Sequence, residues 1–386
     1  MKIIAITPVV VNAELRNWVF VKVETDEGIT GWGEASLEWK TRGVAGCVAD
    51  LTPFLLGEDP TRIEHLYQIM YRQSFFRPGL VGMSAVSGIE QACWDIFGKS
   101  LGVPVYKLLG GLVRDHIRMY DHLGGGEMRS LYLDDQPDIM AERARSSVED
   151  GFSAVKVLVV PRTLPLDGTA GLRHAERCMA AIRRAVGDDV DIMVDLHGRT
   201  WPEMAIRYAD VLAPYRPWFF EEPVPPENVD ALAQVARAIR IPVATGERLV
   251  TRHQFREVFE KRACGIIQPD LCHCGGLLEA RKIAAMAETY YISVAPHNPL
   301  GPVATAAALQ FGFATPNFLI QEYFRSDVPW RDEVLVEPLA FDRGVAYPTD
   351  LPGLGVEVDE MVAARHPYKQ EEILRYFHPD MSVADW

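Results

Sequence analysis

Six acidic or histidine residues recur at nearly constant spacing through the second half of the chain. They are Asp195, Glu221, Glu247, Asp270, His297 and Glu322, and successive members are 26, 26, 23, 27 and 25 residues apart. Each lies at or near the end of a short apolar run such as VDIMVD or ISVAPH, so the spacing is that of a repeating strand–helix unit. Because side chains at the C-terminal ends of barrel strands converge on one face, we expect five carboxylates and one imidazole to share a pocket.

A carboxylate cluster of this kind predicts a bound cation, because like charges brought together repel one another. Asp195, Glu221 and Glu247 lie on neighbouring predicted strands and offer hard oxygen ligands. Such ligands favour Mg²⁺, allow Mn²⁺ and disfavour Zn²⁺. A Mg²⁺ ion keeps positions open for water or for a substrate oxygen, so an organic acid could chelate it. Lys156 and Arg199 would add positive charge for such a substrate. Acidic residues also cap helices, but capping accounts for one or two of them rather than for six in a row.

Two histidines are placed to move protons beside this cluster. His297 ends the seventh apolar run and Asp270 the sixth, so the carboxylate could fix the imidazole tautomer and stabilise the imidazolium of a general base. His197 follows Asp195 by two residues. On a continuing strand it would face the same way as Asp195 and approach a ligand from the opposite side. A lone histidine is more often structural than catalytic, and position alone distinguishes these two.

Three other motifs are better explained by structure than by function. Gly98-Lys99-Ser100 resembles the end of a phosphate-binding P-loop, but Cys93 stands where the first glycine is required, and the segment has the pattern of an amphipathic helix. The triplet at 124–126 lacks GxGxxG spacing and predicts a loop. The segment 272–274 (Cys-His-Cys) has three donors in a tight loop and no second cysteine pair, which favours a plain barrel loop over a metal site.

The elements that must position these residues fall into three parts. Residues 1–116 combine alternating strands in 2–36 with helical patterns at 59–73 and 83–102, which predicts an α+β domain. Residues 117–329 alternate eight apolar runs with helix-length segments over about 210 residues. That pattern fits a closed (β/α)8 barrel, with an open doubly wound sheet as the competing architecture. Residues 330–386 are rich in Pro, Asp and Gly, and we expect them to pack back on the first domain.

Composition excludes several classes of protein. Apolar residues make up 48% of the 386 residues, and the net charge is −14 with no densely basic stretch. A nucleic-acid-binding surface would need a basic face, so we expect no nucleic acid partner. No apolar run approaches the ~18 residues of a membrane span, so we expect no membrane partner. The apolar start contains Thr and Pro and reads as a strand rather than a signal peptide. Six cysteines are too sparse for a disulfide framework, which predicts a reduced, cytoplasmic protein.

These residues carry a family likeness that runs nearly end to end. The chain resembles the mandelate racemase branch of the enolase superfamily, and within it the D-galactonate dehydratase family. The blocks that carry the resemblance are Asp195-Leu-His197-Gly-Arg199, Tyr215-Arg-Pro with Glu221-Glu-Pro223, Gly246-Glu247-Arg248, Gln268-Pro-Asp270-Leu, Pro296-His297 with Pro299-Leu-Gly-Pro302, Leu109 to Asp115, and Ser382-Val-Ala-Asp-Trp386.

The resemblance implies a modified (β/α)7β barrel with an α+β capping domain, and a metal-dependent hydro-lyase. We also expect the protein to be a homo-oligomer. Asp195, Glu221 and Glu247 would bind the Mg²⁺ that holds the carboxylate of a sugar acid. His297, oriented by Asp270, would remove the proton α to that carboxylate. Glu322 would stabilise the enediolate, and His197 would protonate the departing 3-hydroxyl. The product would be a 2-keto-3-deoxy sugar acid, with D-galactonate as the expected substrate. Residues 13–17 and 74–79 would cover the pocket and set substrate length.

One departure from the family bears on the reaction. Members with a lysine base on the second barrel strand carry Lys-x-Lys, whereas this chain has Lys156-Val-Leu158. Racemisation needs acid–base groups on both faces of the α-carbon, so Leu158 favours dehydration. A dehydratase for gluconate, mannonate or another aldonate, and an epimerase or racemase on the same metal site, stay open as alternatives. A barrel retained only for binding is a third reading, but folding alone does not demand three ligands and two positioned histidines.

Overall fold

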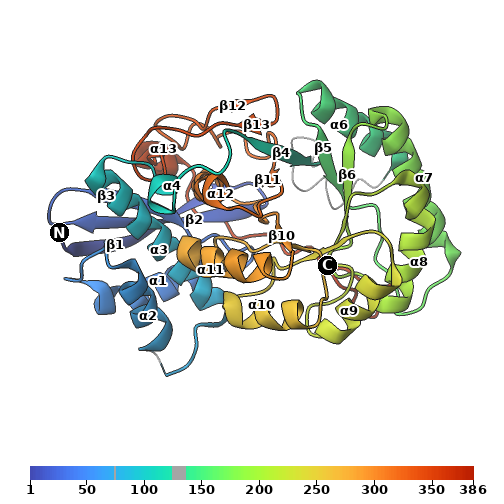
Figure 1. Ribbon diagram of the computed structural model, residues 1–386, viewed down its shortest axis with the longest axis horizontal. Helices are drawn as coiled ribbons and strands as arrows, with labels where there is room; N and C mark the ends of the chain where they lie inside the picture. Colours follow the sequence, from blue (N-terminus) through green and yellow to red (C-terminus); the bar gives the residue numbers. More distant parts are fainter. Residues whose placement is uncertain (74, 124–135) are drawn as a thin grey trace.

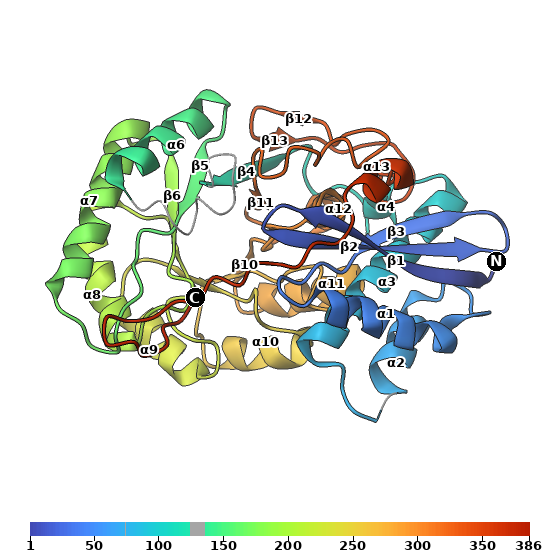
Figure 2. The ribbon, with the colours of Figure 1, turned by 180° about the vertical axis from the view of Figure 1, so that it is seen from behind.

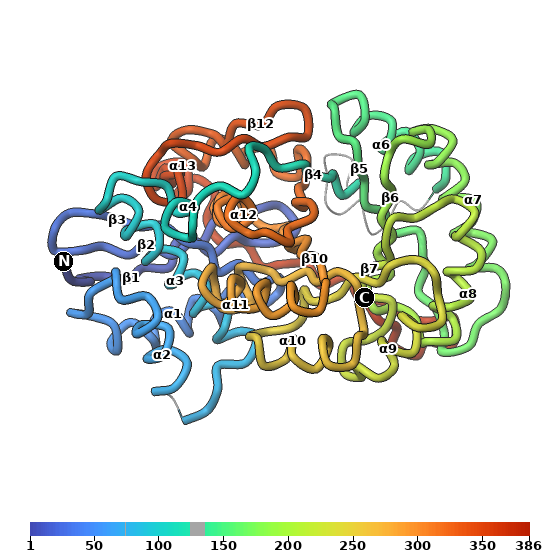
Figure 3. Tube along the Cα trace, in the orientation of Figure 1, coloured from blue at the N-terminus to red at the C-terminus, as the bar shows by residue number. Residues whose placement is uncertain are grey.

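The computed structural model describes residues 1–73, 75–123 and 136–386 of the chain. An N-terminal sheet with its helices lies on one side of the molecule, and a ring of helices around short strands lies on the other (Figure 1). The tube trace in Figure 3 separates these two parts along the long axis of the molecule. The glycine triplet at 124–126 lies outside the described residues.

The capping domain is built on a three-stranded antiparallel sheet. Its strands, in the order β1-β2-β3, are β1 (Ile3–Ala13), β2 (Arg16–Thr25) and β3 (Thr30–Glu34). Helices α1 (Thr41–Leu55), α2 (Ile63–Arg72), α3 (Gly79–Leu101) and α4 (Val105–Leu108) follow. The sheet approaches α3 closely where β3 carries glycines. A Cβ at Gly33 would lie 2.0 Å from the backbone oxygen of Gly88, so only glycine allows this contact. The P-loop lookalike 98–100 falls in the last turn of α3, as predicted.

The barrel has eight parallel strands in the described part of the chain. They are β4 (Ile117–His122), β5 (Ala154–Val157), β6 (Asp191–Asp195), β7 (Phe220–Glu221), β8 (Val243–Thr245), β9 (Ile266–Ile267), β10 (Ser293–Val294) and β11 (Gln321–Tyr323). Parallel pairing runs from β4 through β10 in sequence order, and β11 pairs with β4. A parallel bridge between Val294 and Phe318, with Leu319 N donating to Val294 O at 2.7 Å, joins β10 to the segment leading into β11. The ring therefore closes, which excludes the open doubly wound sheet.

Seven helices follow the first seven strands, within the described residues. They are α6 (Pro137–Glu149), α7 (Thr169–Val186), α8 (Pro202–Leu212, continued by a 3-10 turn at Ala213–Tyr215), α9 (Val229–Ala238), α10 (Thr251–Glu260), α11 (Gly276–Glu288) and α12 (Pro302–Ala314). In α7, Leu172, Ala175, Met179 and Ile182 are buried at helical spacing, so one face packs on the barrel. In α12 every residue is buried, and its near-continuous apolar sequence fits a helix covered on all sides. The predicted (β/α)7β barrel is confirmed.

One layer of side chains fills the inside of the barrel. Each of the eight strands or its flanking residue contributes one member: Tyr120, Ala154, Met193, Phe219, Ala244, Ile266, Ala295 and Ile320. Large and small residues are mixed in this layer, as close packing in a narrow barrel requires. This layer of side chains lies beneath the C-terminal ends of the strands, where the predicted site residues lie.

Buried carboxylates of the capping domain attach it to the barrel. Glu34 accepts hydrogen bonds from Gly301 N at 2.7 Å and Ala304 N at 2.8 Å, at the start of α12. Glu90 accepts from the backbone N–H groups of Leu277 and Leu278, both at 2.8 Å, at the start of α11. The free N–H groups and positive end of a helix N-terminus stabilise a carboxylate placed there. The orientation of the cap over the strand ends is therefore fixed by two specific contacts.

The last part of the chain contacts both the cap and the barrel. It contains β12 (Phe341–Asp342), β13 (Val345–Ala346) and α13 (Glu360–Arg365), and β13 pairs antiparallel with the start of β4. On the capping side, Lys369 N donates to Asn17 Oδ1 at 3.1 Å. The final segment then runs from the side of α13 across to the barrel and ends near α9 (Figure 2). The domain boundaries at 116 and 329 stay a prediction. No helix of the described segments is long and apolar enough to span a membrane.

Candidate active site

A cavity of about 380 Å³ lies between the C-terminal ends of the barrel strands and the capping domain. The barrel contributes Lys156, Asp195, His197, Glu247, Arg248, His273, His297, Pro299, Leu300, His122 and Phe324; the cap contributes Leu37, Glu38, Trp39, Lys40, Leu80 and Val81; the final segment contributes Asp385 and Trp386. Five of the nine predicted site residues thus line one cavity, and the other four, Arg199, Glu221, Asp270 and Glu322, are not part of its lining. A concave space with converging charged groups is the usual form of a small-molecule site.

The three predicted metal ligands occupy consecutive strand ends. Asp195 and Glu221 are partners in the pairing of β6 with β7, and Glu247 follows β8 by two residues. All three are largely buried, and burial raises the pKa of Glu247 to about 7. Burial also raises the pKa of Glu221 well above its ordinary value, and the charges of Asp195, Glu322 and Glu247 act in the same direction against that of Lys156. The energetic cost of ionising this cluster is therefore high.

Lys156 is the internal counter-ion of the cluster. Its Nζ lies 2.8 and 2.9 Å from the two carboxylate oxygens of Glu221, 2.6 Å from Glu322 Oε1 and 4.0 Å from Asp195 Oδ2. Although burial opposes it, the charges of Glu221 and Glu322 raise the pKa of Lys156 well above its ordinary value. These contacts favour the ammonium form of Lys156.

Glu322 is held as a carboxylate by its neighbours. Its Oε2 accepts a hydrogen bond from Asn298 N at 2.7 Å, and its Oε1 contacts Lys156. Burial alone would raise its pKa, but Lys156 and the hydrogen bond with His122 hold the pKa well below its usual range. In this arrangement Glu322 is the carboxylate partner of the Lys156 ammonium.

The donor set fits a hard divalent cation in its chemistry. Within the described ranges, no three His, Cys, Asp or Glu side chains are gathered closely enough to coordinate one ion. Glu221 instead turns both oxygens to Lys156. The Lys156 ammonium is a single positive charge beside Asp195, Glu221 and Glu322, so ionisation of all three carboxyl groups would leave net negative charge at these strand ends. Oxygen donors with uncompensated charge are what Mg²⁺ or Mn²⁺ requires.

The predicted dyad of His297 and Asp270 forms. His297 Nδ1 lies 2.8 Å from Asp270 Oδ2, and because a carboxylate only accepts, Nδ1 donates. The other ring nitrogen, Nε2, faces Glu247 Oε2 at 3.2 Å. Burial lowers the proton affinity of the ring, but the charge of Glu247 and the hydrogen bond to Asp270 outweigh it and raise the pKa of His297 to about 10. Nε2 is thus the atom that exchanges protons with the cavity.

His197 reaches the cavity by a route that strand alternation did not predict. Strand β6 ends at Asp195, and His197 has a positive φ of 56°, so a left-handed turn rather than a continuing strand directs it. The turn is fixed by His197 N, which donates to Asp195 Oδ1 at 2.7 Å, and by Gly198 at φ 69°. His197 Nδ1 lies 2.7 Å from the main-chain oxygen of Trp386. Burial and the charge of Arg199 lower the pKa of His197 to about 3, against the effect of the Trp386 hydrogen bond.

Arg199 lies behind the cavity and outside its lining. Its Nε donates to the main-chain oxygen of Trp386 at 2.7 Å, and its Nη1 donates to Val160 O at 3.1 Å. Its side chain is therefore engaged with the backbone. This placement favours a role in holding the final segment over the predicted direct contact with a substrate.

Among the lining residues that were given no role from the sequence are His122, Arg248, His273 and Trp386. His122 ends β4, so the strand-end rule applied to the weak first run would have found it. Its ring is 4.8 Å from that of Phe324, and burial lowers its pKa to about 4. Arg248 binds Glu222, with Nε 3.0 Å from Oε2. His273 joins Ser84 Oγ at 3.0 Å and Asp270 Oδ2 at 3.5 Å. The residue type of Trp386 could not indicate its contact with His197, because the main-chain oxygen makes that contact.

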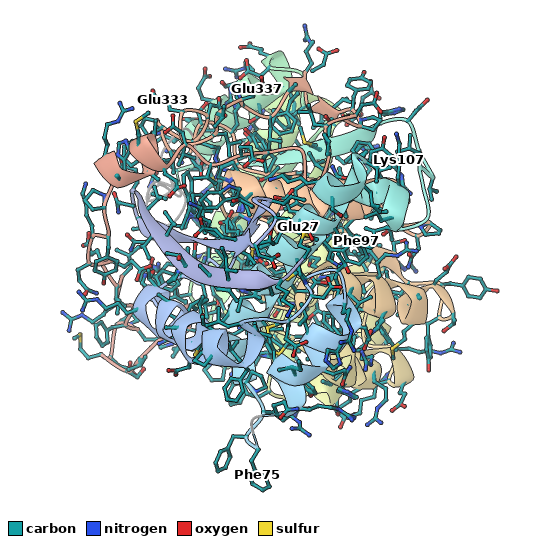
Figure 4. The ribbon with its side chains drawn as sticks, turned by 90° about the vertical axis from the view of Figure 1, so that its left-hand side faces the viewer. Glu27, Phe75, Phe97, Lys107, Glu333 and Glu337 are labelled. Atoms are coloured by element: carbon teal, nitrogen blue, oxygen red, sulfur yellow. The ribbon has the colours of Figure 1, made fainter. Side chains whose placement is uncertain are left out.

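The cap residues that line the cavity differ from those expected. The lining comes from 37–40 and 80–81, whereas residues 13–17 stand one layer back. Arg16, for example, is buried, and its Nη1 donates to Glu38 Oε1 at 2.7 Å. In the segment 75–79, Phe75 and Phe76 are exposed, and Phe75 projects from the molecular surface (Figure 4). Leu158 also does not line the cavity, because it packs with Phe324 and Leu15.

Two family models match the chain over most of its length. Residues 5–110 match the mandelate racemase / muconate lactonizing enzyme N-terminal domain, and residues 139–362 match the enolase C-terminal domain-like model. The first range falls in the capping domain, and the second covers most of the barrel and the start of the final part.

Curated relatives and solved structures agree with these models. Proteins named D-galactonate dehydratase from Pectobacterium atrosepticum and Ralstonia pickettii are each 41% identical to this chain over 379 residues, covering 96% of both chains. The structure of a mandelate racemase/muconate lactonizing enzyme from Sulfitobacter sp. superimposes with a TM-score of 0.89 at 37% identity, over 96% of each chain. A member of the enolase superfamily from Salmonella Typhimurium gives a TM-score of 0.89 at 34% identity, over 95% of this chain and 98% of that one. The resemblance inferred from the motifs is confirmed, and the chain belongs to the mandelate racemase/muconate lactonizing enzyme family of the enolase superfamily.

Proposed function

We propose that this protein is a hydro-lyase that removes water from a sugar acid, with D-galactonate as the first substrate to test. The observation that carries the proposal is the placement of two histidines on opposite sides of one carboxylate-lined cavity. His197 follows β6 and His297 follows β10, and these strands are four places apart in the ring of eight described strands. The names of the relatives support an acid sugar as the substrate class.

In this proposal Asp195, Glu221 and Glu247 hold Mg²⁺, or Mn²⁺ in its place. When bound, the ion would supply positive charge for the substrate carboxylate and would offset the charge of Glu247, which raises the pKa of His297. Lys156, which contacts both Glu221 and Glu322, would keep Glu322 as its partner. The Lys156 ammonium would then bind the substrate carboxylate, which is the role that the sequence predicts for this residue.

The two histidines divide the proton transfers. His297 Nε2 takes the proton from C2 of the aldonate, while Asp270 stabilises the imidazolium through Nδ1. His197, which must carry a proton on Nε2 as well as on Nδ1 for this step, gives the Nε2 proton to the 3-hydroxyl, so the C3–O bond breaks with water as the leaving group. The electron pair of the C2–H bond becomes the C2=C3 double bond of an enol, and the enol tautomerises to the 2-keto-3-deoxy acid. One aldonate thus yields one keto acid and one water.

The environment of β5 supports dehydration over racemisation. The second-strand position of the lysine base is Leu158, which packs with Phe324 and Leu15. Lys156 stays protonated among its carboxylate partners. Neither residue of this strand end is therefore suited to remove a proton from the other face of the α-carbon.

The proposal is tested by incubating the protein with Mg²⁺ and a panel of aldonates that includes D-galactonate, gluconate and mannonate, and by measuring 2-keto acid formation. We expect turnover of at least one aldonate and none in the Glu221→Gln variant. The absence of keto acid from every aldonate, with Mg²⁺ and with Mn²⁺, would contradict the proposal.

A further inference from the structure

The final segment of the chain forms one wall of the cavity. Asp385 and Trp386 line it beside Trp39 and His197. A small hairpin presents these residues, because Phe377 pairs with Val383 and Ala384 N donates to Tyr376 O at 3.1 Å. The indole Nε1 of Trp386 donates to Leu374 O at 2.9 Å. Trp386 is therefore held by its own segment in a defined position.

Trp386 contacts the cap and the barrel at the same time. Its ring lies 4.4 Å from that of Trp39, on the cap, and 5.7 Å from that of His197, on the barrel. The cap side of this contact is itself fixed, because Glu371 accepts from Trp39 N at 3.2 Å and from Thr41 Oγ1 at 2.9 Å. The aromatic contacts thus hold the final segment between two parts that both border the cavity.

The main-chain oxygen of Trp386 makes the contact with chemical consequence. It lies 2.7 Å from His197 Nδ1 and 2.7 Å from Arg199 Nε. A main-chain oxygen only accepts hydrogen bonds here, so Nδ1 of His197 must carry a proton and the ring orientation is set. Asp270 does the same for His297. Each proposed proton-transfer histidine therefore has an acceptor at Nδ1, but for His197 that acceptor comes from a segment far away in the sequence.

We infer that Trp386 is a positioning residue that fixes His197 for proton delivery, through its main-chain oxygen rather than its indole. Arg199 holds the same oxygen and keeps it in place. The inference rests on the proposed function, because it assigns His197 to the leaving-group side of that reaction. It predicts that loss of this oxygen impairs departure of the 3-hydroxyl while α-proton removal by His297 continues.

The test compares the full chain with two variants in deuterated water, using an aldonate that the full chain dehydrates. One variant ends at Ala384 and lacks the oxygen; the matched control, Trp386→Phe, keeps it and loses the indole. In the shortened chain we expect dehydration to fall by ~10²-fold, within the range for general acids, and α-proton exchange to fall by less than about tenfold. Trp386→Phe should keep the ratio of exchange to dehydration of the full chain. Dehydration within about threefold of the full chain, or an equal fall of both rates, would overturn the inference.

A second measurement works even if the shortened chain does not fold. Nitrogen NMR of labelled histidine in the full chain, assigned with His197→Asn, reports which ring nitrogen carries the proton. We expect Nδ1–H at His197, and an unprotonated Nδ1 would overturn the inference. If the full chain dehydrates no aldonate, the proposed function fails, and the NMR measurement still decides the contact with Trp386.

Discussion

The Nδ1 partners of the two histidines come from different parts of the chain. His297 donates to the side-chain carboxylate of Asp270, which the neighbouring strand positions, whereas His197 donates to a main-chain oxygen of Trp386. A carboxylate beside Nδ1 stabilises the imidazolium that forms when a base takes a proton. The contact with Asp270 is therefore consistent with a base at His297.

Substitution of each histidine should therefore stop the reaction at a different step. His297→Asn should lose both dehydration and exchange of the α-proton with deuterated water, because nothing removes that proton. His197→Asn should lose dehydration but retain some exchange, because the dyad of His297 and Asp270 is intact. We expect each loss to be ~10²–10⁴-fold. NMR in deuterated water measures both rates, and full exchange in His297→Asn with none in His197→Asn would reverse the roles.

Lys156 is expected to matter for stability as well as for chemistry. Its ammonium is buried among Glu221, Glu322 and Asp195, so Lys156→Met leaves carboxylates without their partner. Loss of one member of a buried ion pair costs about 3–5 kcal/mol. We expect urea unfolding to show a loss of that order, partly reversed by Mg²⁺. Lys282→Met, at the exposed pair with Glu64, is the matched control and should change stability little. Equal losses in the two variants would contradict this view of the cluster.

At the scale of elements, the contact of α3 with α11 introduces a titrating group, Glu90, that is not part of the cavity lining. Burial raises the pKa of Glu90 to about 8, although the N–H groups of Leu278 and Leu277 act in the opposite direction. Between pH 4.5 and 8 the folded state therefore holds a proton at Glu90 that the unfolded state has released. Because the folded state binds more protons, the free energy of unfolding must fall as pH rises through this range, by up to about 1.4 kcal/mol per pH unit.

Glu90→Gln should remove this contribution. We expect the free energy of unfolding of the variant to depend less steeply on pH between about 5 and 8 than that of the unsubstituted chain. The variant should also be less stable at the acidic end of the range, because its amide NH₂ faces backbone donors. Urea titrations at several pH values measure both effects. Parallel pH profiles for the two proteins would mean that Glu90 does not titrate in this range.

The strands and helices could be predicted from the sequence because the apolar runs repeat. Their exact ends and the turns that follow them could not. The run 153–160 predicted a strand, and β5 forms at its start, Ala154–Val157. The position of Asp195 followed from the strand pattern, whereas that of His197 depends on a left-handed turn that no periodicity encodes. The run that ends at His122 was too weak to draw attention to its last residue.

Contacts between distant segments were beyond prediction for a different reason. The pairing of Asp270 with His297 follows from neighbouring strands, so local order was enough. Trp386 meets His197 across nearly half of the chain, through a main-chain atom that every residue possesses. Side-chain type and spacing carry no information about such a contact. The same holds for the cap, where 37–40 rather than 13–17 border the cavity.

At the scale of the whole molecule, cation binding and folding should be linked. The proposed ligands come from three separate strands, and the unfolded chain does not bring them together. An ion that binds only the folded state stabilises it by about 2.7 kcal/mol at a concentration 100 times its Kd. We therefore expect Mg²⁺ to raise the melting temperature after treatment with EDTA and to restore turnover. Glu221→Gln should lose most of this rise, as differential scanning calorimetry would show. A melting temperature unaffected by Mg²⁺ would count against the metal site.

The two carboxyl groups that attach the capping domain to the barrel have a consequence for chimeras built from related proteins. Glu34 and Glu90 belong to one part of the chain, while the helix starts that receive them, at Gly301 and Leu277, belong to the other. A chimera that joins the cap of one protein to the barrel of another inherits half of each contact from each parent. Where the parents differ, a carboxyl group is buried without its hydrogen-bond donors, and the hybrid loses stability even if each half folds normally. Swaps limited to 37–40 and 80–81 leave both contacts whole, which makes these short segments the natural units for altering substrate choice.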